Sequence, residues 1–305
     1  MMTPQSIAAP LPQAPSASAS TWRDYLELTK PGLSLLSVLT ALAGYFAARP
    51  EIALRPLLAL ALGTTFCAGG AAALNQFLEA DTDARMRRTQ ERPLPAGRLP
   101  NGAAFVLGTG LSFVGVALLL SLVNGLAAAC AGLTIVTYLA LYTPAKRTSR
   151  WSTEIGAVAG ALPPLIGWTA AENAFGPLGW ILFGVLLLWQ IPHFMAIAWL
   201  CRDDYAAAGF PMLAVRDARG GRVAWYAFLS TLLLGSLGVV PAVLGLATWT
   251  FGAAAALLGV WFAQVAWRFV RGEKTASAAR RLFFVSIIHL PLLLGALVTD
   301  RLLFR

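Results

Sequence analysis

NQFLEADTDARMRRTQERPLPAGRLP, residues 75–100, is the stretch that decides the fold, because it sets a concentrated polar segment at the end of a long apolar run. Asn75, Glu79 and Asp83 recur every fourth residue, so their side chains share one face if the preceding helix continues this far. Mg²⁺ suits such a face, since it takes one or two carboxylates and completes its shell with water and phosphate oxygens. Asp81 is a weaker candidate ligand, because a step of two residues turns it away.

Basic residues follow these acids directly. Guanidinium groups bind phosphate oxygens through paired hydrogen bonds, so the segment suits a diphosphate held beside the metal. The arginines concerned are Arg85, Arg87, Arg88 and Arg92. A second basic segment, YTPAKRTSRWSTE at residues 142–154, has no acid before Glu154 and indicates another anion-binding element. The two segments together predict a site for a metal-bound diphosphate.

Composition places this site in a membrane. The chain has 305 residues, of which 58% are hydrophobic and 12% charged, and its mean hydropathy is +0.68. Repeated apolar runs of about 20 residues match the thickness of a bilayer. The net charge of +9 is divided among short groups between these runs, which disfavours a nucleic-acid partner. The composition therefore predicts an all-α, multi-pass membrane protein.

The apolar runs predict nine membrane-spanning helices. Glycine and proline interrupt several of them, which a bilayer tolerates where neighbouring helices or a cavity satisfy the freed backbone groups. The predicted spans are residues 33–49, 54–78, 101–121, 125–143, 155–171, 177–199, 223–245, 250–271 and 281–300.

Basic residues are distributed unequally between the two ends of these spans. With a cytoplasmic N-terminus, all of the 23 lysines and arginines face the cytoplasm except Arg49, Arg55, Arg301 and Arg305. The positive-inside rule therefore favours that orientation and an odd number of spans. Every long polar loop then lies on one face, which predicts a reaction chamber open to the cytoplasm. Anchoring alone is the favoured interpretation for three basic residues at span ends, Arg85, Arg87 and Arg98.

Residues 1–21 have a different character from the rest of the chain. They are rich in Pro, Ala and Ser and have no basic region followed by an apolar core, so they predict a disordered tail rather than a secretory signal. Residues 22–305 form the predicted membrane domain. Because the first basic residue is Arg23, a mitochondrial transit peptide is disfavoured. A bacterial plasma membrane is therefore preferred to the mitochondrial inner membrane.

Four motifs in one order resemble the UbiA superfamily of intramembrane prenyltransferases, and within it the branch that farnesylates protohaem IX. The resemblance extends over nearly the whole chain from about Tyr25 onward. The motifs are N-x-x-x-[DE]-x-x-x-D running on as D-x-x-M-x-R-T-x-x-R-P-L (75–94), YTPAKR (142–147), WQIPHF (189–194) and DYAAAGFPMLAV (204–215).

This resemblance implies a nine-helix bundle with a central cavity and a Mg²⁺-dependent reaction. Farnesyl diphosphate would lose its diphosphate, and the farnesyl group would join a vinyl group of haem b with addition of water. Catalytic roles fall to Asn75, Glu79, Asp83, Arg88 and Arg92, the first three also as metal ligands. Substrate-binding roles fall to Tyr142, Lys146, Arg147, His193, Asp204 and Tyr205.

Two positions depart from the wider superfamily. Glu79 stands where many members have Asp, and its longer arm is expected to reach a metal as well. In the second acidic loop, Leu200 replaces the first acid of D-x-x-x-D and Asp204 keeps the second. This departure weakens a complete second Mg²⁺ site and is typical of the haem-farnesylating branch. The same resemblance makes haem A synthase or a terminal-oxidase assembly a candidate partner.

Two other functions remain open at this point. One is prenylation of a different acceptor, such as a quinone precursor, which Leu200 and the WQIPHF segment disfavour. The other is secondary transport, which the broken helices favour and the concentration of charge on one face disfavours.

Overall fold

The computed structural model describes residues 21–49, 53–272 and 275–304, and in these segments the regular secondary structure is all helical, without a strand. Of the predicted tail, only Thr21 lies inside the described residues. The first half contains α1 (Trp22–Leu28), α2 (Pro31–Ala48), α3 (Leu54–Asp83), α4 (Asn101–Leu122), α5 (Gly125–Val136), the π-helical segment η1 (Thr137–Tyr142), α6 (Thr143–Thr148) and α7 (Ser152–Ala161). The second half contains α8 (Pro163–Glu172), α9 (Pro177–Leu200), α10 (Arg202–Ala207), α11 (Leu213–Arg216), α12 (Gly221–Val243), α13 (Trp249–Arg271) and α14 (Ala276–Phe304).

Eight helices in the described segments are long and apolar enough to cross a membrane. They are α2, α3, α4, the continuous run α5–η1–α6, α9, α12, α13 and α14. Their outer faces carry exposed apolar side chains such as Val106, Phe113 and Leu257, which a bilayer covers. The all-α, multi-pass prediction is confirmed.

The ninth predicted span, 155–171, is divided into two helices. α7 ends at Ala161 and α8 begins at Pro163, so neither ten-residue helix has the length of a span on its own. The break falls there because Pro163 and Pro164 have no N–H to donate to the preceding turn. The predicted count of nine spans is therefore not confirmed.

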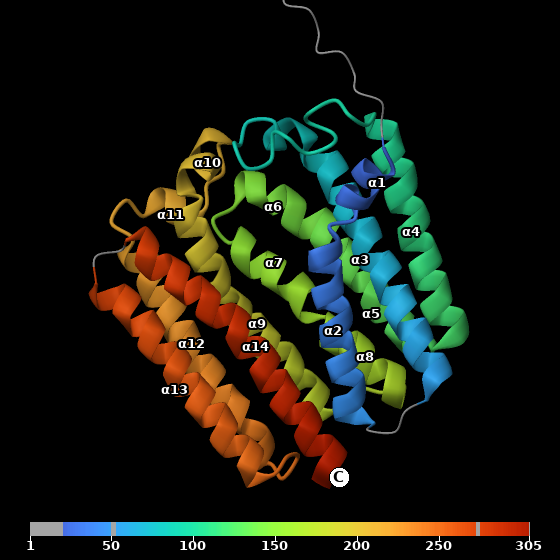
Figure 1. The fold of residues 1–305 in the computed structure, drawn as a ribbon, viewed down its shortest axis with the longest axis vertical. Helices are drawn as coiled ribbons and strands as arrows, with labels where there is room; N and C mark the ends of the chain where they lie inside the picture. The colour runs from blue at the N-terminus through green and yellow to red at the C-terminus, as the bar shows by residue number, and fades with distance from the viewer. Residues whose placement is uncertain (1–20, 50–52, 273–274, 305) are drawn as a thin grey trace, which may run out of the picture.

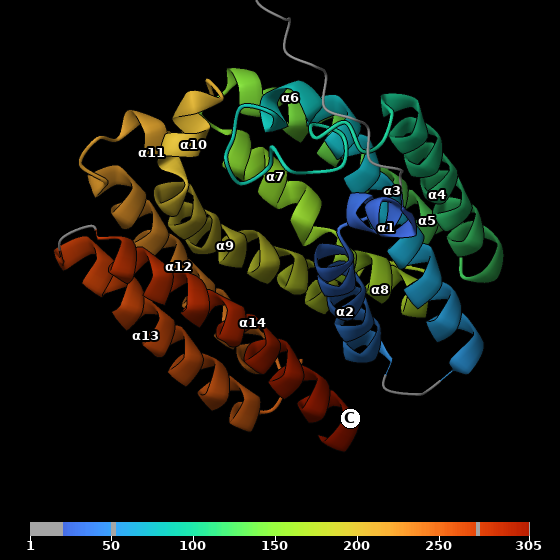
Figure 2. The same ribbon diagram turned by 45° about the horizontal axis from the view of Figure 1, so that its top comes forward.

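The polar segments gather at one end of the bundle. α1, α6, α10, α11 and the loop that follows α3 lie together at the top of Figure 1, and Figure 2 brings this end forward. The long helices descend from it. This arrangement agrees with the expectation that the long polar loops share one face.

Two groups of helices form separate cores on either side of the bundle. α9, α12, α13 and α14 pack together around side chains such as Phe262 and Leu290, and α2, α3, α5 and α8 pack around Tyr45 and Leu60. α2 and α8 approach so closely that a Cβ on Gly167 would lie 1.6 Å from the carbonyl oxygen of Ala41. Glycine is therefore required at this crossing.

Candidate active site

The last turns of α3 present the three predicted metal ligands on one face. Asn75, Glu79 and Asp83 are each at most 3% exposed, because α3 continues as a regular helix to Asp83. Asp81 lies off this face and is exposed, as the helical spacing predicts. Buried carboxylates need charged or hydrogen-bonding partners.

Each of the three residues is bonded to a different cation. Lys30 Nζ donates to Asn75 Oδ1 at 3.0 Å, and Arg92 donates to Asp83 Oδ2 at 2.6 Å. Lys146 Nζ donates to both oxygens of Glu79, at 2.8 and 2.9 Å. The cluster therefore combines three cations with two carboxylates. We call these six residues the cation–carboxylate cluster: Lys30, Asn75, Glu79, Asp83, Arg92 and Lys146.

Three different elements bring the cations to α3. Lys30 precedes Pro31 at the start of α2, Lys146 comes from α6, and Arg92 from the loop after α3. That loop is tied back to the helix end, since the Thr89 hydroxyl donates to the carbonyl of Asp83 at 2.8 Å. α6 is fixed from the other side. There the Asn75 side-chain amide donates to the hydroxyl of Thr143 at 3.1 Å.

The crowding of cations affects the ionisation of Lys30. Its removal from water, together with the like charges of Arg92 and Lys146, lowers the pKa of Lys30 to about 7. The carboxylates of Glu79 and Asp83 oppose this effect. An additional anion in the cluster would relieve the same repulsion.

The donor set fits a hard cation. No three His, Cys, Asp or Glu side chains converge as a metal centre anywhere in the described chain. Mg²⁺, however, requires only one or two carboxylates when water and phosphate oxygens complete its shell. Glu79, Asp83 and the amide oxygen of Asn75 supply this set, and each is bonded to a cation with which a metal ion would compete.

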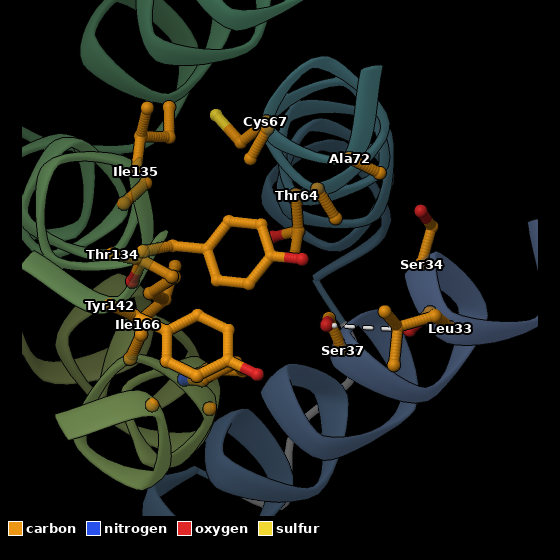
Figure 3. Close-up of a pocket in the computed structure, with 18 of the residues that line it drawn as sticks. Leu33, Ser34, Ser37, Thr64, Cys67, Ala72, Thr134, Ile135, Tyr142 and Ile166 are labelled. Atoms are coloured by element: carbon orange, nitrogen blue, oxygen red, sulfur yellow. Dashed lines mark hydrogen bonds between the residues drawn. The ribbon is translucent and has the colours of Figure 1, made fainter. Parts of the chain in front are cut away.

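An apolar cavity of about 240 Å³ adjoins the cluster. It is enclosed by α2, α3, α5, η1, α7, α8 and α9, and small residues such as Ala71, Ala72 and Gly160 line much of it. Figure 3 shows Tyr142 pointing into this space, with Cys67 and Thr64 on the α3 side. Its lining suits a hydrocarbon chain.

Tyr142 joins the cavity to the cluster. Its ring lines the cavity and lies 5.0 Å from Lys146 Nζ, while Tyr138 stacks against it at 5.5 Å between ring centroids. A Cβ on Gly156 would lie 2.7 Å from the Tyr142 ring, so glycine at this position leaves room for the aromatic side chain. The apolar and polar parts of the site therefore meet at Tyr142.

The second predicted loop reaches the site through an aromatic contact. The guanidinium of Arg88 lies 5.0 Å from the ring centroid of Tyr205 in α10. Burial raises the pKa of the Tyr205 hydroxyl, which keeps that group neutral. Asp204 is half-buried beside Tyr205, whereas Asp203 is exposed and bonded to Arg202.

Two of the predicted substrate-binding residues, Arg147 and His193, have their partners away from the cluster. Arg147 is exposed and donates to Asp81 and to the carbonyl of Leu78, with distances of 2.6 and 2.8 Å. His193 lies between the rings of Trp189 and Phe283, and its Nδ1 is 2.8 Å from the Ser286 hydroxyl. The neighbouring Phe194 lines the cavity, but His193 faces α14.

Lys30 and Thr143 are the cluster contacts that the sequence did not reveal. In the sequence, Lys30 is simply one of the basic residues that precede a span. The residues around Thr143 do not indicate that its partner is Asn75, which lies 68 positions away. The one available signal for Lys30 is that proline follows it, which marks a helix start without indicating the direction of the side chain.

The fold and the site together define a helical membrane protein with a charged cluster next to an apolar cavity. The chain belongs to the UbiA prenyltransferase family, whose sequence profile matches residues 37–288. The resemblance identified from the four motifs is confirmed.

Several relatives cover most of the chain. A protein of Opitutus terrae named protoheme IX farnesyltransferase is 57% identical over 286 residues, which is 94% of this chain and 97% of that protein. A protein of Arabidopsis thaliana named mitochondrial protoheme IX farnesyltransferase is 39% identical over 92% of this chain and 65% of its own length.

Solved structures share the fold at low sequence identity. One described as a digeranylgeranylglyceryl phosphate synthase has a TM-score of 0.77 and 18% identity, over 92% of this chain and 98% of its own. A UbiA homolog from Archaeoglobus fulgidus bound to GPP and Mg²⁺ has a TM-score of 0.66 and 12% identity, over 90% of this chain and 99% of its own. At these identities the likeness concerns the fold alone.

Proposed function

We propose that the chain is a haem O synthase, which transfers the farnesyl group of farnesyl diphosphate to a vinyl group of haem b. Addition of water completes the hydroxyethylfarnesyl side chain, and diphosphate is released. The observation that carries this proposal is the position of Tyr142, which lines the apolar cavity and touches the charged cluster through Lys146. A substrate with an anionic head and an apolar tail fits both parts at once.

The acceptor is assigned through the relatives. Those named protoheme IX farnesyltransferase include one with 57% identity across nearly the full length of both chains. The departure at Leu200 points in the same direction, because it removes the first acid of the motif found in enzymes that prenylate aromatic rings. A quinone precursor is therefore the second candidate acceptor.

Charge separation is the step that the cluster would assist. As the bond between farnesyl carbon and diphosphate oxygen breaks, negative charge accumulates on the leaving group. Lys146 and Arg92, already fixed at the end of α3, would bind that charge more strongly in the transition state than in the substrate. Arg88, which rests on Tyr205, would add a third cation from the loop.

A metal ion would be held by Asn75, Glu79 and Asp83. When bound there, Mg²⁺ supplies further positive charge to the diphosphate oxygens. Binding would loosen Lys146 and Arg92 from their carboxylates, and both could then donate to phosphate. With Mg²⁺ bound, the three cations and the metal would face two carboxylates, and this surplus of positive charge supports a dianionic or more highly charged ligand.

The cavity would protect the reactive farnesyl group. A farnesyl cation is quenched by water, so its chain must lie in a dry space until the acceptor arrives. The small apolar residues around the cavity provide that space, and the rings of Tyr138 and Tyr142 stand where positive charge would develop.

Haem b would approach from the α9 side of the site. His193 remains a predicted haem contact, and because its Nδ1 faces Ser286, such a contact would use Nε2. The polar end, with Arg147, Asp204 and Tyr205, would lie at the cytoplasmic face of a bacterial plasma membrane. The distribution of basic residues supports this orientation.

The experiment is a reconstitution with purified full-length protein in detergent. We expect Mg²⁺, farnesyl diphosphate and haem b together to yield haem O, detected by its mass, and chelation of divalent ions to stop the reaction. Intact haem b, under conditions where the Opitutus terrae relative forms product, would contradict the proposal. Turnover of a quinone precursor in its place would select the second acceptor.

A further inference from the structure

Lys30 differs from the other two cations of the cluster, because among the described residues it has no carboxylate partner. Lys146 is bonded to Glu79 and Arg92 to Asp83, whereas the recorded partner of the Lys30 ammonium is the neutral amide oxygen of Asn75. Within the described residues no carboxylate oxygen lies within the 4.0 Å of an ion pair from it. An ammonium carries three donors, so one neutral acceptor leaves it poorly satisfied.

The backbone at Lys30 is held in an unfavourable conformation. Its φ is 45° and its ψ 64°, the left-handed region that non-glycine residues rarely adopt, and Pro31 begins α2 immediately afterwards. Such conformations persist only where the surrounding structure enforces them, and they cluster at functional sites. Here the left-handed turn directs the Lys30 side chain toward Asn75 on α3.

The Lys30 side chain is also accessible from outside the cluster. It lines an open groove of about 440 Å³ between α1, the start of α2 and the loop after α3. Arg92 lines the same groove, and Leu33 lines both the groove and the apolar cavity. The groove therefore leads from the surface to two cluster cations and adjoins the space for the hydrocarbon chain.

We propose that Lys30 is a further diphosphate-binding residue, which leaves Asn75 and donates to phosphate oxygens when that amide oxygen is taken by a metal ion. The inference rests on the proposed function, because it takes the diphosphate of the substrate to be the counter-ion of Lys30. Lys30 would then contact the diphosphate together with Lys146. The two lysines reach α3 from different elements and bond to neighbouring residues of its polar face, Lys30 to Asn75 and Lys146 to Glu79.

A purely structural role makes a different prediction. If Lys30 only bridged α2 and α3 through Asn75, its loss would lower stability and leave affinity for diphosphate unchanged in the folded fraction. A measurement of diphosphate affinity therefore distinguishes the two roles better than a measurement of enzyme turnover does.

The test uses full-length protein with Mg²⁺ and inorganic diphosphate as the probe, followed by isothermal titration calorimetry. Lys30→Asn removes the charge while tolerating the left-handed backbone, and Lys30→Arg keeps a cation. Arg219→Gln is the control, since Arg219 is an exposed arginine in the loop between α11 and α12 with no role assigned in the site. We expect Lys30→Asn to weaken diphosphate binding about 10- to 100-fold, the effect of one charge-assisted hydrogen bond.

Lys30→Arg should recover most of that affinity, and Arg219→Gln should bind as the wild type does. In turnover, Lys30→Asn should raise the KM for farnesyl diphosphate and leave the KM for haem b unchanged. Should Lys30→Asn fail to fold, Lys30→Gly replaces it with the same criteria, because glycine accepts this φ freely.

Unchanged diphosphate affinity in a folded Lys30→Asn or Lys30→Gly protein overturns the inference. Failure of the proposed function has a different signature. In that case the wild type binds diphosphate, loses it on substitution of Lys30, and yet forms no haem O. A wild type that binds no diphosphate overturns both proposals.

Discussion

Lys146 Nζ lies within 3 Å of both carboxylate oxygens of Glu79, although 67 positions of sequence separate the two residues. Glu79 is buried near the end of α3, and Lys146 reaches it from α6. The pair fixes α6 against α3 and sets the Lys146 ammonium beside the Tyr142 ring. One contact thus determines both local packing and the position of a cation at the cavity.

Disrupting this pair should affect stability and activity in separable ways. Lys146→Met leaves the Glu79 carboxylate buried without a partner, so we expect the free energy of unfolding to fall by about 3 to 5 kcal/mol. Glu79→Gln combined with Lys146→Met removes both charges and should recover most of that loss. Farnesyl transfer should remain at least about 100-fold reduced in the double variant, because the charges that assist diphosphate departure are gone. Thermal unfolding in detergent and a product assay provide the two readouts. Restored activity in the double variant would show that the pair is only structural.

The Arg92 contact with Asp83 depends on the shape of the guanidinium as well as on its charge. Arg92→Lys keeps the charge but loses the planar fork that donates to a carboxylate and a phosphate together. We expect kcat/KM for farnesyl diphosphate to fall about tenfold, with the KM for haem b unchanged. Arg87→Lys, on an exposed residue of the same loop, is the control. Equal effects of the two substitutions would argue against a specific role for Arg92.

The cavity should determine which prenyl chain fits. Ala71 lines it and lies about 12 Å before Glu79 along α3, at about 1.5 Å per residue. Ala71→Phe fills this part of the cavity, so farnesyl transfer should fall about tenfold or more while transfer from the shorter geranyl diphosphate is affected less. Leu62→Phe, on an exposed position of the same helix, should leave the ratio of the two rates unchanged. If Ala71→Phe left the ratio of the two rates unchanged, the prenyl chain would have to bind away from Ala71.

Arg98 attaches α1 to the loop after α3. It donates to Asp24 at 2.7 Å and to Glu27 at 2.8 Å, and α1 forms one wall of the groove beside Lys30. Arg98→Ala should therefore raise the hydrogen-exchange rate of the α1 amides, whereas Arg219→Ala, on an exposed residue of another loop, should not. Unchanged exchange in Arg98→Ala would show that other contacts suffice to hold α1.

The same attachment should depend on pH through Asp24. A hydrogen bond from the Thr21 amide and the Arg98 guanidinium hold the pKa of Asp24 below its usual value near 4. A carboxylate with a lowered folded pKa contributes stability above its usual pKa and loses it as the pH falls through the lowered value. The difference in α1 protection between wild type and Arg98→Ala should thus be full at pH 7 and vanish in strong acid. A constant difference down to pH 2 would exclude Asp24 as the group responsible.

Local patterns were sufficient for much of the fold and part of the site. Apolar runs located the long helices, and the four-residue spacing placed Asn75, Glu79 and Asp83 on one buried face with Asp81 off it. The span predicted at residues 155–171 is not confirmed as one continuous helix, because Pro163 and Pro164 divide that apolar segment. Hydropathy sums over a window and does not register a missing backbone donor.

The sequence by itself determined which groups face inward along α3, because helical periodicity is a property of consecutive residues. Only the tertiary structure decided which cation meets each of them. Lys30 and Lys146 come from segments 45 and 67 positions away, and their approach depends on how whole helices pack. That packing also gives Lys30 no carboxylate partner within the described part of the chain, since the direction of a side chain at a strained turn follows from its neighbours in space rather than from those in sequence.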